Sequence, residues 1–150
     1  MPIDDELVGR EGIATVRVTA ETTASAFGNP GLHVFATPAL VALFERAAID
    51  ALADHLGAGE ATVGSIVRVT HRAPTPIGAK ITARARVRAV EDGKVWFDLN
   101  AQDDAEPVGD GEHLRIVVDE ARFQRRVERK AAALGAAPAG HGADHLGDPR

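Results

Sequence analysis

The sequence predicts an α+β domain in which one long central helix is wrapped by a curved antiparallel sheet of about five strands. Two observations support this class. Residues 37–56 form the only long stretch in which apolar side chains recur with helical periodicity. The segments that follow alternate with a period of two and are joined by short turns, so neighbouring strands must run antiparallel. We expect the domain to cover residues 1–135.

The composition excludes several classes of site and partner. Of the 150 residues, 45% are hydrophobic, which is ordinary for a globular domain. The chain contains no cysteine, so disulfides, thiolate metal sites and a cysteine nucleophile are excluded. A formal net charge of −5 argues against nucleic acid as the main partner. No apolar run is long enough to span a bilayer, so we expect no membrane partner.

The two ends of the chain carry few structural signals. Residues 1–6 are acidic and lack a signal-peptide pattern, which favours a cytoplasmic protein. Residues 136–150 are rich in Ala, Gly, Pro and His, and we expect this tail to be disordered. Its histidines, His141 and His145, have no acidic or thiol partners nearby in the sequence, so no metal site is expected.

The central helix has a clear start signal and one unusual residue. Thr37 is a good N-cap, and Pro38 suits the first helical position because it needs no N–H partner there. The periodic pattern runs to Leu56, and Gly57 offers a left-handed stop. Glu45 falls within the apolar stripe, where a carboxylate is costly unless it is paired or catalytic. The alternative is a carboxylate at the edge of the stripe that reaches water.

The remaining segments complete the sheet. His71 lies at the end of an apolar row that we expect to face the helix, and a purely structural histidine is the alternative. In the last strand we expect Leu114, Ile116 and Val118 to point inward. A short polar helix is expected over 121–134. The predicted strands cover residues 12–20, 62–72, 79–90, 95–102 and 111–120, and an irregular loop covers 21–33.

Four short motifs stand out in the sequence: Val34-Phe35-Ala36-Thr37, Glu45, Val63-Gly64-Ser65 and Val69–Pro76. Together they resemble the fluoroacetyl-CoA thioesterase family of hot-dog fold proteins. The Val-Thr-His-x-Ala-Pro-Thr-Pro run is specific, and the spacing from Phe-Ala-Thr to a glutamate is a second, independent match. The similarity extends from about residue 8 to residue 127.

The resemblance implies a function and a set of site residues. The function is hydrolysis of a small acyl-CoA thioester to the free acid and CoA, without a cofactor, since CoA is part of the substrate. The implied catalytic residues are Thr37, Glu45 and His71. The implied substrate or CoA contacts are Gly64, Arg115 and Phe35. Two other functions stay open: a non-catalytic acyl-CoA-binding protein, and a hot-dog hydratase or dehydratase, although no Asp and His pair is arranged as a hydratase motif.

The chemistry fits these residue types but leaves their roles open. A histidine can carry a proton near neutral pH, and a glutamate can orient it, aim a water or attack the carbonyl. Thr37 and Glu45 are eight residues apart, about 12 Å along a helix, so they cannot touch directly. Thr37 must therefore lie just outside the helix, with substrate or His71 between the two residues, or the site must use two subunits. We expect a homodimer. Arg115 fits least well, because alternation places it opposite Leu114; a bulge at Gly109 or Gly111, or contact with the partner subunit, would explain it.

Two further features concern the substrate. The loop over residues 21–33 is several residues shorter than the aromatic-rich lid of the fluoroacetyl-specific enzyme, and it offers only Phe27. Selectivity for a fluorinated acyl group is therefore not expected. An outward row of cations on the third strand could bind CoA phosphates, although a solvated face is the favoured interpretation. This row consists of Lys80, Arg84, Arg86 and Arg88.

Overall fold

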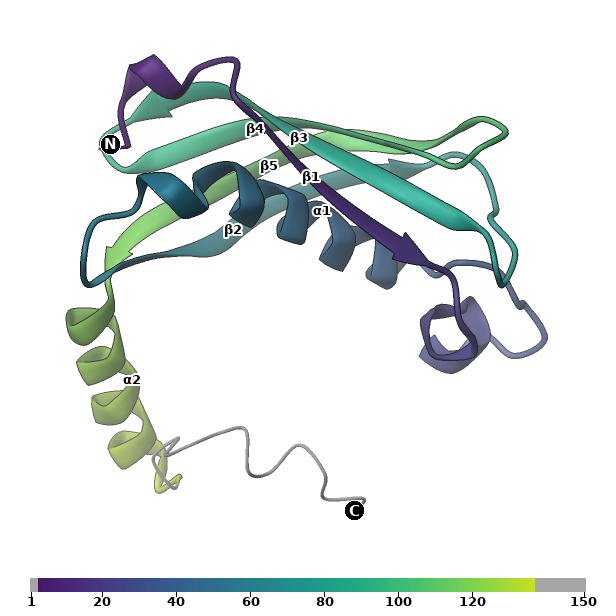
Figure 1. The fold of residues 1–150 in the computed structure, drawn as a ribbon. Helices are drawn as coiled ribbons and strands as arrows, with labels where there is room; N and C mark the ends of the chain where they lie inside the picture. Colours follow the sequence, from purple (N-terminus) through teal and green to yellow (C-terminus); the bar gives the residue numbers. More distant parts are fainter. Residues whose placement is uncertain (1–2, 137–150) are drawn as a thin grey trace.

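The computed structural model describes residues 3–136, in which one long helix lies against a curved five-stranded sheet (Figure 1). This is the α+β arrangement predicted from the periodicity. The predicted tail falls outside the described residues apart from Ala136. The strands are β1 (Glu11–Arg17), β2 (Glu60–His71), β3 (Lys80–Glu91), β4 (Lys94–Gln102) and β5 (Pro107–Asp119). The helices are α1 (Thr37–Leu52) and α2 (Glu120–Leu134), with short 3-10 turns at Asp5–Leu7, Ala20–Thr22, Ala24–Phe27 and Ala53–His55.

Both ends of α1 differ from the prediction. The N-cap is Ala36, whose carbonyl accepts from the Leu40 N–H at 3.0 Å, so Thr37 is the first helical residue. The Thr37 hydroxyl makes no capping bond and is free to interact with His71 at the end of β2. The α-helix ends at Leu52, before the predicted Leu56, because the chain tightens into a 3-10 turn that buries His55. The seven buried side chains of α1 are Leu40, Leu43, Phe44, Ala47, Ala48, Ala51 and Leu52.

The sheet has the strand order β1-β3-β4-β5-β2, and every neighbouring pair is antiparallel. β1 and β2 are therefore its two edges. The helix approaches β1 so closely that a Cβ at Gly12 would overlap the backbone of Ala47 and Ala51. The hydrophobic core fills the space between α1 and the inward side chains of β3 and β4, including Ile81, Val87, Val95 and Phe97. Since α1 packs nearest β1, the β2 side of the helix is left more open.

The inward face of β5 is the opposite of the predicted one. His113 pairs with Phe97 and Arg115 pairs with Val95, and paired residues of antiparallel strands share a face. Because Phe97 and Val95 are core residues, His113 and Arg115 point toward α1 within the same protomer. The row of Leu114, Ile116 and Val118 lies on the outer face instead. The prediction was wrong because it took the apolar row of β5 to be the core row, although this sheet places polar side chains there.

A bulge in β2 also changes which residues face the helix. The pairing with β5 shifts register between Gly64 and Ile66, so that Gly64 pairs with Arg115 and Val67 pairs with His113. After the bulge, the residues from Val67 to His71 that were predicted to face the helix do so. Before the bulge, Gly64 faces the helix in place of Val63. A bulge re-aims side chains in this way because one residue is inserted into one strand only. The bulge thus places Gly64 under the helix.

No helix of residues 3–136 is long and apolar enough to cross a membrane. Within the same range, no group of three or more His, Asp or Glu side chains could hold a metal ion.

Candidate active site

The first polar pair joins the start of α1 to the end of β2. Thr37 Oγ1 lies 2.8 Å from His71 Nδ1. Burial lowers the pKa of the His71 ring, and an interaction with the Ala73 backbone offsets this shift only in part. The ring is therefore neutral near pH 7. A neutral ring with its proton on Nε2 would accept the Thr37 proton at Nδ1, as a base paired with a nucleophile does. His71 Nε2 is buried and has no hydrogen-bond partner among residues 3–136.

This pair borders an open pocket of about 280 Å³. Phe35 forms part of its wall and is otherwise buried, with 2% of its surface exposed. The pocket is largely apolar, with the Thr37–His71 pair as a polar edge, which suits a small acyl group beside a hydrogen-bonding centre. The remaining lining residues are Ala24, Val34, Arg72, Ala73 and Pro74.

The second polar group lies two turns further along α1 and centres on Arg115. Arg115 is 4% exposed, and its Nη1 lies 3.2 Å from Glu45 Oε2. The other guanidinium donors bond to Thr62, with Nε 3.0 Å from Oγ1 and Nη2 3.0 Å from the carbonyl oxygen. Burial lowers the pKa of Arg115, and the nearby Glu45 carboxylate partly offsets this shift. The guanidinium nevertheless stays cationic. Glu45 is therefore paired, while 37% of its side chain is exposed and can meet a ligand.

His113 belongs to this group, although the sequence analysis did not select it. Its side chain is fully buried, and Nδ1 lies 2.7 Å from the Ile66 carbonyl oxygen. A carbonyl only accepts, so Nδ1 carries the proton and Nε2 accepts from Arg115 Nη1 at 3.2 Å. Burial lowers the pKa of His113, which keeps this neutral form. The ring also stacks on Phe97, with centroids 6.1 Å apart. The i, i+2 spacing from Arg115 would have identified His113 had the inward face been assigned correctly.

Gly64 allows Glu45 and Arg115 to meet beside the sheet. A Cβ at this position would overlap Glu45 Oε2 and would lie 3.3 Å from both Arg115 Nη1 and His113 Cε1. Any side chain here would therefore displace the Glu45 carboxylate. The steric reason for glycine is independent of backbone strain, since Gly64 is not among the residues with positive φ.

The structure thus divides the predicted site residues between two places within one protomer. Thr37, His71 and Phe35 meet at one end of α1, whereas Glu45, Gly64 and Arg115 meet further along. The rise of α1 separates the Thr37 and Glu45 positions by about 12 Å.

Comparison with known proteins identifies the family of this chain. Residues 18–121 match the family described as fluoroacetyl-CoA-specific thioesterase. The chain belongs to the fluoroacetyl-CoA-specific thioesterase family. The fluoroacetyl-CoA thioesterase of Streptantibioticus cattleyicolor is 37% identical over 101 residues, which are 67% of this chain and 73% of that protein. Its activity class, hydrolysis of an acyl-CoA thioester, is therefore the activity of this chain.

Solved structures of thioesterases and of a thioesterase superfamily member share the fold. A structure of a fluoroacetyl-CoA thioesterase superposes with a TM-score of 0.76 and 32% identity, covering 82% of this chain and 96% of the other. A variant of it in complex with acetyl-CoA gives 0.78 and 31%, covering 82% and 97%. A thioesterase superfamily member from Thermus thermophilus gives 0.82 and 25%, covering 91% and 98%. The hot-dog fold predicted from the motifs is confirmed.

In this member of the fluoroacetyl-CoA-specific thioesterase family, the loop before α1 folds as two short 3-10 turns. Phe27 ends the second turn and is 53% exposed. It lines a second, mostly apolar pocket of about 270 Å³ with Phe35 and Leu43. Since half of the Phe27 surface meets solvent, this loop supplies little buried aromatic bulk.

Proposed function

We propose that Thr37, Glu45 and His71 carry out thioester hydrolysis and that Gly64, Arg115 and Phe35 bind the substrate. The hydrogen bond between Thr37 and His71 beside an apolar pocket is the main support, since it pairs a hydroxyl with a neutral base. Arg115 holds Glu45 at a defined place, where its exposed oxygen could meet the reacting carbonyl or a water. A thioester is already activated, so this set needs only a nucleophile, a base and an aimed carboxylate.

Two routes use the same residues and balance equally well. In one, His71 takes the Thr37 proton, the hydroxyl oxygen attacks the carbonyl carbon and the carbon–sulfur bond breaks. The CoA thiolate then takes the proton from His71, and water hydrolyses the acyl-threonine. In the other, a water loses its proton to the base and attacks the carbonyl carbon directly, while Thr37 orients the base. The carbon–sulfur bond then breaks, and the CoA thiolate takes the proton from the base. Single-turnover trapping of an acylated Thr37 by mass spectrometry separates these routes.

We also propose that the site is completed in a homodimer. β2 is an edge strand, and unpaired edges of this length are usually covered. If two copies of β2 pair across a two-fold axis, their directions are opposed, and the partner's His71 moves toward the Glu60 end of the strand. Gly64 and Glu45 lie near that end. A partner would therefore close the gap of about 12 Å that separates Thr37 from Glu45 in one protomer.

Mixed dimers test this arrangement sharply. Glu45→Gln and His71→Asn chains, each inactive alone, are co-expressed with different affinity tags, and the mixed dimer is isolated. If His71 and Glu45 act from different subunits, one site of the mixed dimer is intact and about half of the wild-type activity returns. If both residues act within one subunit, the mixed dimer stays inactive and the proposal fails. A monomer in sedimentation experiments would contradict it as well.

We propose a small acyl-CoA as substrate, without strong selectivity for fluoroacetyl-CoA, and a cytoplasmic location that suits such a substrate. The exposed Phe27 supports the weak selectivity. Pockets separate groups differing by one methylene by only about 1–3 kcal/mol, and fluorine differs less from hydrogen in size. Acetyl-CoA and fluoroacetyl-CoA should be hydrolysed within about 10²-fold of each other, with another acyl group preferred, in a free-thiol assay over a panel of acyl-CoAs. A ratio near 10⁴ would contradict this.

A further inference from the structure

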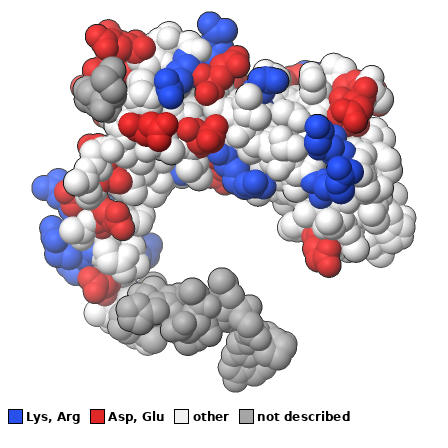
Figure 2. Space-filling model, in the orientation of Figure 1, with Lys and Arg blue, Asp and Glu red and all other residues white. Residues whose placement is uncertain are grey.

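Helix α2 is a basic element of an otherwise acidic chain. It leaves the end of β5 and extends away from the sheet (Figure 1), and none of its residues is buried. The segment Glu120–Leu134 contains four arginines and one lysine but only two glutamates, whereas the whole chain carries a net charge of −5. Figure 2 shows blue side chains along the helix, with red ones between them. The family match ends at residue 121, before all of these arginines.

Three of the arginines share one pocket with an aromatic ring at the root of α2. The pocket has a volume of about 360 Å³ and adjoins the last residues of β5. Arg122, Arg126 and Arg129 follow the i, i+4, i+7 spacing of one helix face, and Phe123 is 40% exposed beside them. The other lining residues are Val117, Val118 and Asp119.

These arginines are available to a ligand. Among residues 3–136, none of the three pairs with a carboxylate within 4.0 Å, and Asp119 is engaged in capping α2 through the Arg122 N–H at 2.8 Å. On β3, Arg88 pairs with both Asp98 and Glu112, and Arg84 lies 3.9 Å from Glu11. Within residues 3–136, no ion pair therefore competes with a ligand for the three arginines of this pocket.

The position of the pocket relates it to the substrate. Val117 and Arg115 lie on the same face of β5 and are two residues apart, about 7 Å along a strand. The pocket therefore adjoins the Glu45–Arg115 end of the site. An acyl-CoA carries at its far end an adenine ring, a diphosphate and a 3′-phosphate, joined to the thioester by the long pantetheine arm. Arginines bind phosphates with paired donors, and an exposed aromatic ring stacks on a base.

We propose that this α2 pocket binds the nucleotide end of the CoA substrate, with Arg122, Arg126 and Arg129 on the phosphates and Phe123 against the adenine. The proposal rests on the proposed function, in which the reacting carbonyl lies where Glu45 and, in the homodimer, the partner's His71 converge. It gives α2 a role outside the matched family region, and it explains how a protein of net negative charge retains a ligand with several negative charges.

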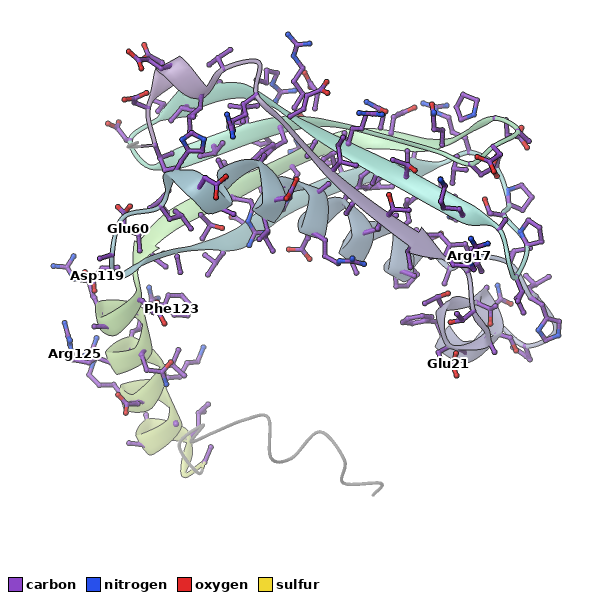
Figure 3. All side chains as sticks on the ribbon, in the orientation of Figure 1. Arg17, Glu21, Glu60, Asp119, Phe123 and Arg125 are labelled. Atoms are coloured by element: carbon purple, nitrogen blue, oxygen red, sulfur yellow. The ribbon has the colours of Figure 1, made fainter. Side chains whose placement is uncertain are left out.

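A comparison of two thioesters tests the proposal. The triple variant Arg122→Ala/Arg126→Ala/Arg129→Ala is assayed with acetyl-CoA and with the acetyl thioester of N-acetylcysteamine, which lacks the nucleotide. The KM for acetyl-CoA should rise about tenfold or more, with a weaker dependence on salt, while kcat/KM for the short thioester stays within about twofold. Arg125→Ala is the matched control, because Arg125 does not line the pocket and leaves α2 on the side opposite Phe123 (Figure 3). It should leave both substrates unchanged.

The outcomes are separable. Equal losses with both thioesters, or no change in the KM for acetyl-CoA, would overturn the nucleotide pocket. If Arg125→Ala raised the KM for acetyl-CoA as much as Arg126→Ala alone, the proposal would also be overturned. An arginine outside the pocket would then contribute as much as one inside it. Failure of the catalytic proposal shows differently, as normal turnover in the Glu45 or His71 variants on either substrate. Thermal unfolding of each variant confirms that the exposed α2 substitutions leave the domain folded.

Discussion

The two polar groups along α1 are built in opposite ways. Thr37 and His71 share a single hydrogen bond at the border of an open pocket. Arg115 and His113 are buried and make a chain of bonds with Glu45, Thr62 and the Ile66 carbonyl. A group with one partner can exchange a proton at little cost, whereas a fully bonded buried charge stays in place. The first is suited to moving a proton, and the second is suited to holding a carboxylate at one position.

The largest expected effect comes from neutralising Glu45, the carboxylate that Arg115 holds in place. Glu45→Gln should lower kcat by at least about 10²-fold, the low end for an acid–base group, and should leave Arg115 without its counter-charge. Steady-state kinetics with acetyl-CoA measures the loss. Glu21→Gln is the control, because Glu21 is exposed on the loop before α1 (Figure 3). Wild-type turnover in Glu45→Gln would reject the catalytic role.

The next effect tests the proton-moving pair. Thr37→Val keeps the shape of the side chain but removes the hydroxyl, and we expect about 10²-fold lower kcat. Thr37→Ser keeps the hydroxyl and should retain activity within about tenfold. The comparison of the two variants measures the hydroxyl itself, independently of packing. Equal activity of the Val and Ser variants would show that the Thr37–His71 bond is not used.

A smaller effect is expected from adding a side chain at Gly64, the position that lets Glu45 approach the sheet. Gly64→Ala would overlap Glu45 Oε2, so the carboxylate must shift while Arg115 stays bonded to Thr62. We expect kcat/KM to fall about tenfold, since a displacement of this size misplaces the acting oxygen. Ala61→Gly, elsewhere on β2, controls for backbone changes in the strand. Unchanged kcat/KM in Gly64→Ala would mean that the position of Glu45 is not critical.

The smallest expected effect on activity comes from His113, but it has a signature in pH. His113→Phe keeps the stack on Phe97 and removes the bonds to Ile66 and Arg115, so activity should fall only a few-fold, about 1 kcal/mol. Burial lowers the folded-state pKa of His113 and His71, so below about pH 6.5 the unfolded chain binds more protons than the folded one. The free energy of unfolding should therefore fall as pH drops through this range.

Denaturant unfolding at pH 7.5 and pH 5.5 checks this dependence. The loss of stability between the two pH values should be smaller in His113→Phe than in the wild type, because one of the two contributing histidines is gone. An equal loss in both proteins would show that His113 does not titrate with folding.

Much of the fold could be predicted from the sequence because it depends on local signals. The periodicity of residues 37–56, the prolines after His71 and the alternation of the later strands predicted one helix on an antiparallel sheet. The polar helix expected over 121–134 is present as α2. The family motifs selected residues that the structure does bring into contact in two groups, although the catalytic role of those residues stays a prediction.

What the sequence determined alone was the class of fold and the identity of the chemical groups, since periodicity and motifs are properties of neighbours along the chain. Only the tertiary structure decided the face to which β5 presents Arg115 and His113, the bulge that places Gly64 beneath Glu45, and the division of the site into two groups. The physical reason is that strand register is set by pairing across the sheet. A single shift of one residue exchanges the two faces of a strand without changing its sequence.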